Sequence, residues 1–68
     1  MAITSRQKKI LDYIGRYIDV HDQPPTIAEI GKQFSMTSSA SVHHILSVLE
    51  HEGRIKRIPN VSRGIELR

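Results

Sequence analysis

The 68-residue sequence contains no cysteine, which excludes disulfide bonds and thiolate metal sites and is compatible with a reducing cytoplasm. The core must therefore come from aliphatic packing. No segment approaches the roughly twenty consecutive apolar residues of a membrane span, and the N-terminus lacks the apolar block of a signal peptide. We therefore expect a soluble cytoplasmic protein with no membrane partner. The length predicts one domain over residues 1–68 and no separate catalytic domain.

Charge is balanced in most of the chain and basic only near its end. Residues 54–68 hold five basic groups and one acidic group, whereas the first 53 residues hold five basic and six acidic groups, which gives a net charge of +3. A basic tip on a nearly neutral body favours a polyanion that docks from one side. A basic surface alone is also found on many proteins that bind no nucleic acid.

The first helix is predicted at about residues 5–20. Thr4 and Gln7 have the spacing of a capping box, in which the two side chains bond each other's backbone amides. The helix must end before Pro24 and Pro25, which cannot continue it. Its apolar stripe has helical spacing and comprises Ile10, Leu11, Ile14 and Ile18.

A second, shorter helix is predicted at about residues 27–34. Thr26 and Glu29 repeat the capping-box spacing at its start. Gly31 lowers helix stability, so we expect another helix to approach closely there. The inner side of this helix is expected to carry Ile27, Ile30 and Phe34.

The third helix is predicted at about residues 39–52, with Ser38 or Ser39 as its cap and Gly53 as a left-handed stop. Its buried stripe comprises Val42, Ile45, Leu46 and Leu49, and its opposite face comprises Ala40, Ser41, His43, His44, Ser47 and His51. Such short polar side chains are unusual on a purely solvated helix, and they suit a helix that enters a DNA groove.

The chain ends in a predicted β-hairpin at about residues 54–67. Two short β-prone runs flank the turn signal of residues 59–62, and Ile65 and Leu67 alternate with charged residues, which predicts that both face the core. The fold class is therefore mainly α (α+β): a three-helix winged helix-turn-helix with a C-terminal two-stranded β-hairpin as its wing. Three helices followed by a hairpin indicate this fold more specifically than the short spacing between the second and third helices does alone.

The residues resemble the N-terminal DNA-binding domain of LexA-type repressors. The matching runs are TSRQ at 4–7, PPTIAEI at 24–30, the helix end at 49–53 and SRGIEL at 62–67. The resemblance implies a repressor that binds a palindromic operator on double-stranded DNA as a homodimer, usually in the SOS response to DNA damage. It also implies a self-cleaving Ser/Lys peptidase domain that dimerises, which is absent from these residues, so dimerisation is expected from outside them.

The sequence departs from that family on the third helix. The best-known LexA has Asn at the position of Ala40 and a Glu pair at the positions of His43 and His44. The resemblance therefore implies the fold and the binding mode but not the operator sequence.

Base contacts are predicted from the polar face of the third helix. Serines can donate to or accept from base edges, Ala40 can meet a thymine methyl, and the histidines can donate to guanine or phosphate. The predicted base-contacting residues are Ser39, Ala40, Ser41, His43, His44 and Ser47. For the serines at the helix start, local capping is an alternative role that can coexist with DNA contact.

Phosphate contacts are predicted from helix starts, nearby cations and the wing. They are Arg6, Thr26, Lys32, Ser38, Arg57, Asn60, Ser62 and Arg63. For the wing cations, the alternative is an edge strand that positive charge protects from pairing.

We predict no metal, no cofactor and no catalysis. The histidines of the third helix diverge around it with no cysteine or close carboxylate to complete a ligand set, and no nucleophile and base stand at informative spacing. If His43 and His44 face DNA, their protonation should strengthen binding as the pH falls. The alternative function is a winged-helix protein-interaction module, which would be expected to expose an apolar patch on the third helix.

Overall fold

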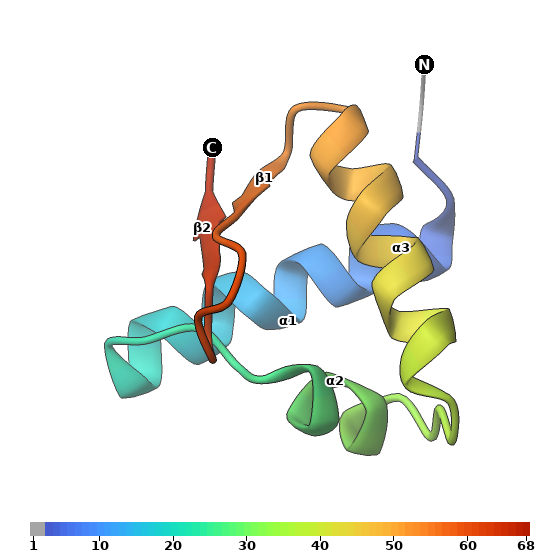
Figure 1. Ribbon diagram of the computed structural model, residues 1–68, viewed down its shortest axis with the longest axis horizontal. Helices are drawn as coiled ribbons and strands as arrows, with labels where there is room; N and C mark the ends of the chain where they lie inside the picture. Colours follow the sequence, from blue (N-terminus) through green and yellow to red (C-terminus); the bar gives the residue numbers. More distant parts are fainter. Residues whose placement is uncertain (1–2) are drawn as a thin grey trace.

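The computed structural model describes residues 3–68, so the first two residues of the predicted domain lie outside the described part. The elements are α1 (Ser5–His21), α2 (Ile27–Gln33), α3 (Ser39–His51), β1 (Ile55–Arg57) and β2 (Ile65–Leu67), shown in Figure 1. Three helices and a two-stranded antiparallel hairpin confirm the mainly α winged helix-turn-helix fold. Each helix ends within one residue of its predicted limits.

Capping boxes start the first two helices, as predicted. The Thr4 hydroxyl accepts from the Gln7 amide at 3.1 Å, and the Gln7 side chain accepts from the Thr4 amide at 2.9 Å. In α2 the Thr26 hydroxyl accepts from the Glu29 amide at 3.1 Å, and Glu29 Oε1 accepts from the Thr26 amide at 2.8 Å. These bonds satisfy amides that a helix start leaves without partners.

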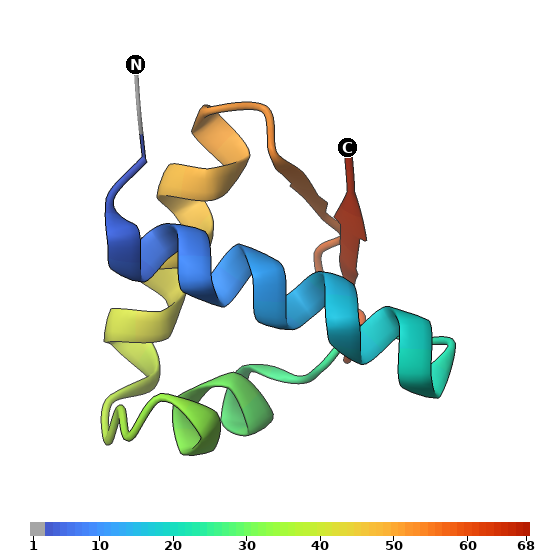
Figure 2. The same cartoon turned by 180° about the vertical axis from the view of Figure 1, so that it is seen from behind.

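The helices enclose one aliphatic core. Figure 2 shows α1 crossing α3, with the hairpin beside the C-terminal half of α1. The predicted stripe of α3 is buried in full, whereas α1 buries Ile10 and Ile14 of its stripe and α2 buries Ile30. The core residues are Ile10, Ile14, Ile30, Val42, Ile45, Leu46, Leu49, Ile55 and Ile65.

The turn between α2 and α3 depends on two small residues. Ser35 adopts a left-handed conformation, φ 55°, and the Met36 amide donates to the Gly31 carbonyl at 2.8 Å, which closes the helix end. A Cβ on Gly31 would lie 3.1 Å from the Met36 carbonyl oxygen and 3.6 Å from Val42 Cγ2. The predicted close approach at Gly31 is confirmed, and both α3 and the turn make it.

The hairpin differs from its prediction in strand length and in the place of Leu67. Each strand has three residues, and β2 begins only at Ile65 because the left-handed φ of 60° at Arg63 interrupts the extended backbone before it. Ile65 is buried, but Leu67 is 45% exposed, so the prediction that both face the core is wrong for Leu67. Leu67 lies beyond the core and beside Gly15 of α1. Because glycine has no side chain, α1 covers little of the Leu67 side chain at this point.

Candidate functional site

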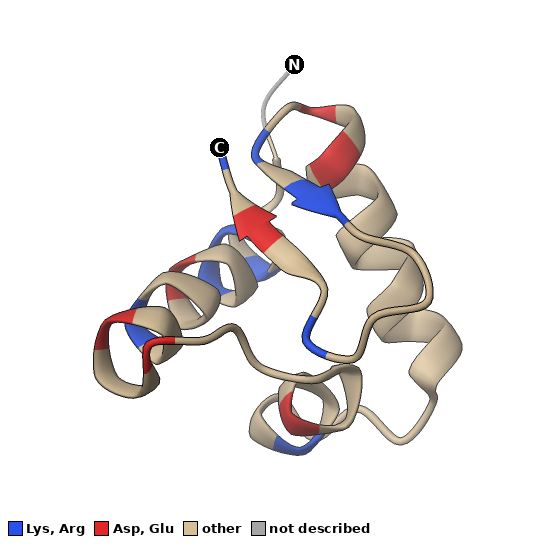
Figure 3. Ribbon diagram, turned by 60° about the vertical axis from the view of Figure 1, so that its left-hand side comes forward, with Lys and Arg blue, Asp and Glu red and all other residues tan. Residues whose placement is uncertain are grey.

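The exposed face of α3 presents all six predicted base-contacting side chains. Helical periodicity buries the apolar stripe and leaves the opposite face in solvent. The exposed residues are Ser39, Ala40, Ser41, His43, His44 and Ser47. Figure 3 shows α3 free of Lys and Arg along its length, with acid only at its C-terminal end. The face therefore offers hydrogen-bonding groups with little charge of its own.

The start of α3 lacks a side-chain cap. Ser38 occupies the predicted cap position, but its hydroxyl makes no cap hydrogen bond, so the predicted capping bond is wrong. The first amides of α3 and the exposed Ser38 hydroxyl consequently point to solvent at the positive end of the helix dipole. This end is suited to an anion.

Arg63 has different surroundings from those the sequence predicted. Its Nη1 donates to Glu29 Oε1 at 2.7 Å, to the Pro24 carbonyl at 3.0 Å and to the Tyr17 hydroxyl at 3.2 Å. Its Nη2 donates to Glu29 Oε2 at 3.2 Å. These bonds occupy most of the guanidinium donors, so Arg63 anchors the wing to α1 and α2, and its phosphate contact stays a prediction.

Glu29 is the centre of this network. It closes the capping box of α2 with Thr26, and it also accepts from the Tyr17 hydroxyl at 3.1 Å. The Arg63 guanidinium, together with the Thr26 amide and the Tyr17 hydroxyl, lowers the pKa of Glu29 from 4.5 to about 2. The capping role of Glu29 is predictable from its spacing to Thr26, but no local signal indicates the ion pair, because Arg63 lies 34 positions away in the sequence.

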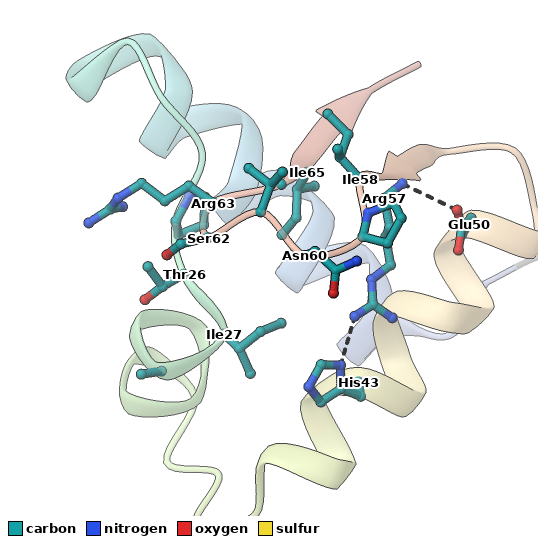
Figure 4. Close-up of a pocket in the computed structure, with 15 residues that line it drawn as sticks. Thr26, Ile27, His43, Glu50, Arg57, Ile58, Asn60, Ser62, Arg63 and Ile65 are labelled. Atoms are coloured by element: carbon teal, nitrogen blue, oxygen red, sulfur yellow. Dashed lines mark hydrogen bonds between the residues drawn. The ribbon is translucent and has the colours of Figure 1, made fainter.

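Arg57 connects the wing to α3. Its backbone amide donates to Glu50 Oε2 at 3.2 Å, and its Nη2 donates to His43 Nδ1 at 2.7 Å. His43 and Glu50 stand seven residues apart, which places them on one face of α3 two turns from each other. Figure 4 shows the Arg57 side chain between them, at the opposite end of the site from Arg63. Sequence reasoning named His43 and Arg57 separately and missed their contact.

The remaining predicted phosphate-contacting residues lie on three elements. Arg6 is exposed on α1 and donates from Nη2 to the Phe34 carbonyl at 3.2 Å. Lys32 is exposed on α2, and Asn60 and Ser62 are exposed on the loop of the wing. Their side chains make no hydrogen bond within residues 3–68, so the polar groups of Lys32, Asn60 and Ser62 are available to a ligand.

A groove between the wing, the start of α2 and α3 brings several of these side chains together. Its volume is about 710 Å³, and its lining includes Thr26, His43, Arg57, Asn60, Ser62 and Arg63. A separate shallow depression at the other end of α3 brings together Arg6, Ser38, Ala40, Ser41 and His44. Neither region is lined by Lys32, Ser39 or Ser47. The other predicted residues thus divide between two regions along α3.

Residues 3–68 contain neither a metal-ligand cluster nor a membrane-spanning helix. Residues 3–68 contain no group of three or more His, Cys, Asp or Glu side chains arranged to hold a metal ion. Within the same range, every helix is too short or too polar to cross a membrane.

Comparison with known proteins identifies relatives over nearly the whole chain. The model of the LexA DNA binding domain family matches residues 1–64. The LexA repressor of Staphylococcus haemolyticus is 43% identical over 65 residues, which are 96% of this chain and 31% of that protein. The LexA repressor of Mycobacterium tuberculosis is 42% identical over 67 residues, 98% of this chain and 28% of that protein. The chain therefore spans about a third of the length of the curated relatives it matches.

Proposed function

The chain belongs to the LexA DNA-binding domain family, and from that membership we propose that it binds double-stranded DNA sequence-specifically as part of a LexA-like transcriptional repressor. In this proposal α3 enters the major groove and the wing contacts the backbone or minor groove. The observation that carries the proposal is the exposed face of α3, which holds six short polar or small side chains above a buried apolar stripe.

Phosphate contacts would supply most of the affinity. The uncapped start of α3 and the Ser38 hydroxyl offer donors to one phosphate. The Thr26 hydroxyl oxygen accepts the Glu29 amide within the capping box, and the hydroxyl proton stays free to be donated to a second phosphate. These contacts would be extended along the DNA backbone by Lys32, Arg57, Asn60 and Ser62. Arg63 would mainly hold the wing in place through Glu29, and its predicted phosphate contact would use the donors that the ion pair leaves over.

The proposed target is a palindromic operator bound by a homodimer, with one α3 per half-site. Paired recognition helices mirror the two-fold symmetry of such a site. Dimerisation would come from protein outside residues 1–68, and the setting would be the SOS response to DNA damage. The domain itself would perform no catalysis and need no cofactor, and it would act in the cytoplasm.

A protein-interaction module is the alternative, and the exposed surface argues against it. The large apolar side chains that are exposed among the described residues are Val20, Val61 and Leu67. None of them lies on α3, so that face lacks the apolar patch expected of a protein-docking helix.

Gel-shift titration with palindromic duplex DNA at low and moderate salt tests the proposal. We expect binding by the unaltered domain and a large loss in the double variant Ser41→Glu, Ser47→Glu, which puts two negative charges on the exposed face. The matched control is Arg16→Gln with Arg68→Gln, which changes the net charge equally in a depression that shares no residue with the groove. A domain that fails to bind any duplex at low salt would overturn the proposed function.

A further inference from the structure

The contact between Arg57 and His43 determines what the imidazole can offer to a ligand. Arg57 Nη2 lies 2.7 Å from His43 Nδ1. An arginine side chain has only donors and keeps its charge, so Nδ1 must be the acceptor in this bond. In a neutral imidazole the proton then resides on Nε2. The arginine thus selects one of the two tautomers.

The placement of Arg57 is supported from a second point. Its backbone amide donates to Glu50 Oε2 at 3.2 Å, which holds β1 against α3 two turns beyond His43. The Arg57 side chain is partly buried along this path, whereas the His43 ring is exposed. Nε2 has no hydrogen-bond partner among residues 3–68. The ring therefore presents a single N–H donor beside the groove shown in Figure 4.

We propose, on the basis of the function proposed above, that Arg57 is a positioning residue that fixes His43 as a donor and so makes the half-site reject cytosine at the base facing His43. In the major groove guanine presents acceptors at N7 and O6, adenine an acceptor at N7 and thymine an acceptor at O4. Cytosine presents only the donor of its N4 amino group. A fixed Nε2–H can bond any of the first three bases but meets cytosine donor to donor.

Removal of the arginine should relax this discrimination. In Arg57→Ala both tautomers of His43 are accessible, and the one protonated on Nδ1 can accept from the cytosine amino group through Nε2. The cytosine penalty, about fivefold or more for one good contact in the unaltered domain, should shrink at that one base. Preferences at the other bases should stay, while overall affinity falls by the loss of any phosphate contact that Arg57 makes.

The first test measures the tautomer without DNA. Ring ¹⁵N chemical shifts of His43 at pH 8 should show the Nε2–H form in the unaltered domain and a clear population of the Nδ1–H form in Arg57→Ala. Arg57→Lys keeps a positively charged donor and should restore the Nε2–H form. Identical tautomer populations in the unaltered domain and Arg57→Ala would overturn the positioning role, whether or not the domain binds DNA.

The second test measures base preference by selection from random duplex DNA with the domain as a forced dimer. We expect cytosine to be depleted at one base per half-site, tolerated there in Arg57→Ala and depleted again in Arg57→Lys. His43→Ala should lose the preference at the same base. Uniform weakening with unchanged preferences in Arg57→Ala would show that Arg57 only contacts phosphate and would overturn the proposal. A failure of the unaltered domain to bind any duplex would instead overturn the proposed function on which this one rests.

Discussion

The guanidinium of Arg63 and the carboxylate of Glu29 form a two-point ion pair, with Nη1 2.7 Å from Oε1 and Nη2 3.2 Å from Oε2. The pair joins the wing to the start of α2 over a long distance in sequence. It also neutralises a carboxylate that, in the proposed function, would otherwise repel a phosphate near Thr26. One contact thereby positions the wing and offsets the charge of Glu29.

Loss of the Glu29 charge should destabilise the domain in a pH-dependent way. The pKa of Glu29 is lowered from 4.5 to about 2, so its ionised form contributes stability that is complete above pH 4.5 and is lost as the pH falls towards 2. Glu29→Gln, which keeps a capping side chain, should lower the melting temperature by several degrees at pH 7 and by little near pH 2. Thermal unfolding of both proteins at the two pH values measures this.

The control for that experiment is Asp12→Asn. Asp12 faces Lys8 at 3.4 Å with both side chains about half exposed, and such surface pairs contribute little. We expect its melting temperature to stay close to that of the unaltered domain at pH 7. A deficit of Glu29→Gln that is the same at pH 7 and pH 2 would show that the charge is not what stabilises the wing.

Two glycines should respond oppositely to alanine. A Cβ on Gly64 would lie 2.5 Å from the Ile58 carbonyl oxygen and 2.7 Å from that of Val61, whereas one on Gly15 would meet Leu67 Cδ1 at an ordinary 3.7 Å. Gly64→Ala should therefore cost about 1 to 3 kcal/mol by forcing the hairpin apart. Gly15→Ala should stabilise α1 by up to about 1 kcal/mol. Urea unfolding midpoints measure both, and equal shifts would contradict the hairpin geometry.

The salt dependence of DNA binding should identify the cations that meet phosphate. Lys32 is exposed on α2 without a partner among the described residues, and its removal should reduce the salt slope by about 0.9. Arg16 is also exposed, on α1, but lines the separate depression beside Leu67. Fluorescence anisotropy from low to moderate salt should give an unchanged slope for Arg16→Ala. If the salt slope falls by the same amount when Lys32 or Arg16 is removed, DNA does not bind preferentially on the side of the domain that carries Lys32.

Local features of this domain could be predicted from sequence because they depend on residues close in the chain. Capping boxes join residues three apart, and periodicity decides which face of α1 or α3 is buried. The left-handed stop at Gly53, φ 75°, belongs to the same class of local signal. All six side chains predicted for the exposed face of α3 are exposed for this reason.

Contacts between distant segments could not be predicted in the same way. Nothing local indicates that Arg63 turns towards Glu29 while Arg57 turns towards His43, although both arginines belong to the same basic wing. The exposure of Leu67 was unpredictable for a similar reason. Strand alternation indicates which face of the hairpin Leu67 lies on, but it does not indicate how far the core extends along that face. The tertiary fold therefore determines which side chain each arginine contacts within the domain.

The most direct test of DNA binding by α3 and the wing is an NMR titration of the ¹⁵N-labelled domain with duplex DNA at low salt. We predict that amide shift changes will concentrate at the start and exposed face of α3, at Thr26 and in the wing loop of residues 58–64. Residues around Gly15 and Leu67 should change little. Changes centred on Gly15 and Leu67, or none anywhere, would contradict the proposed interface.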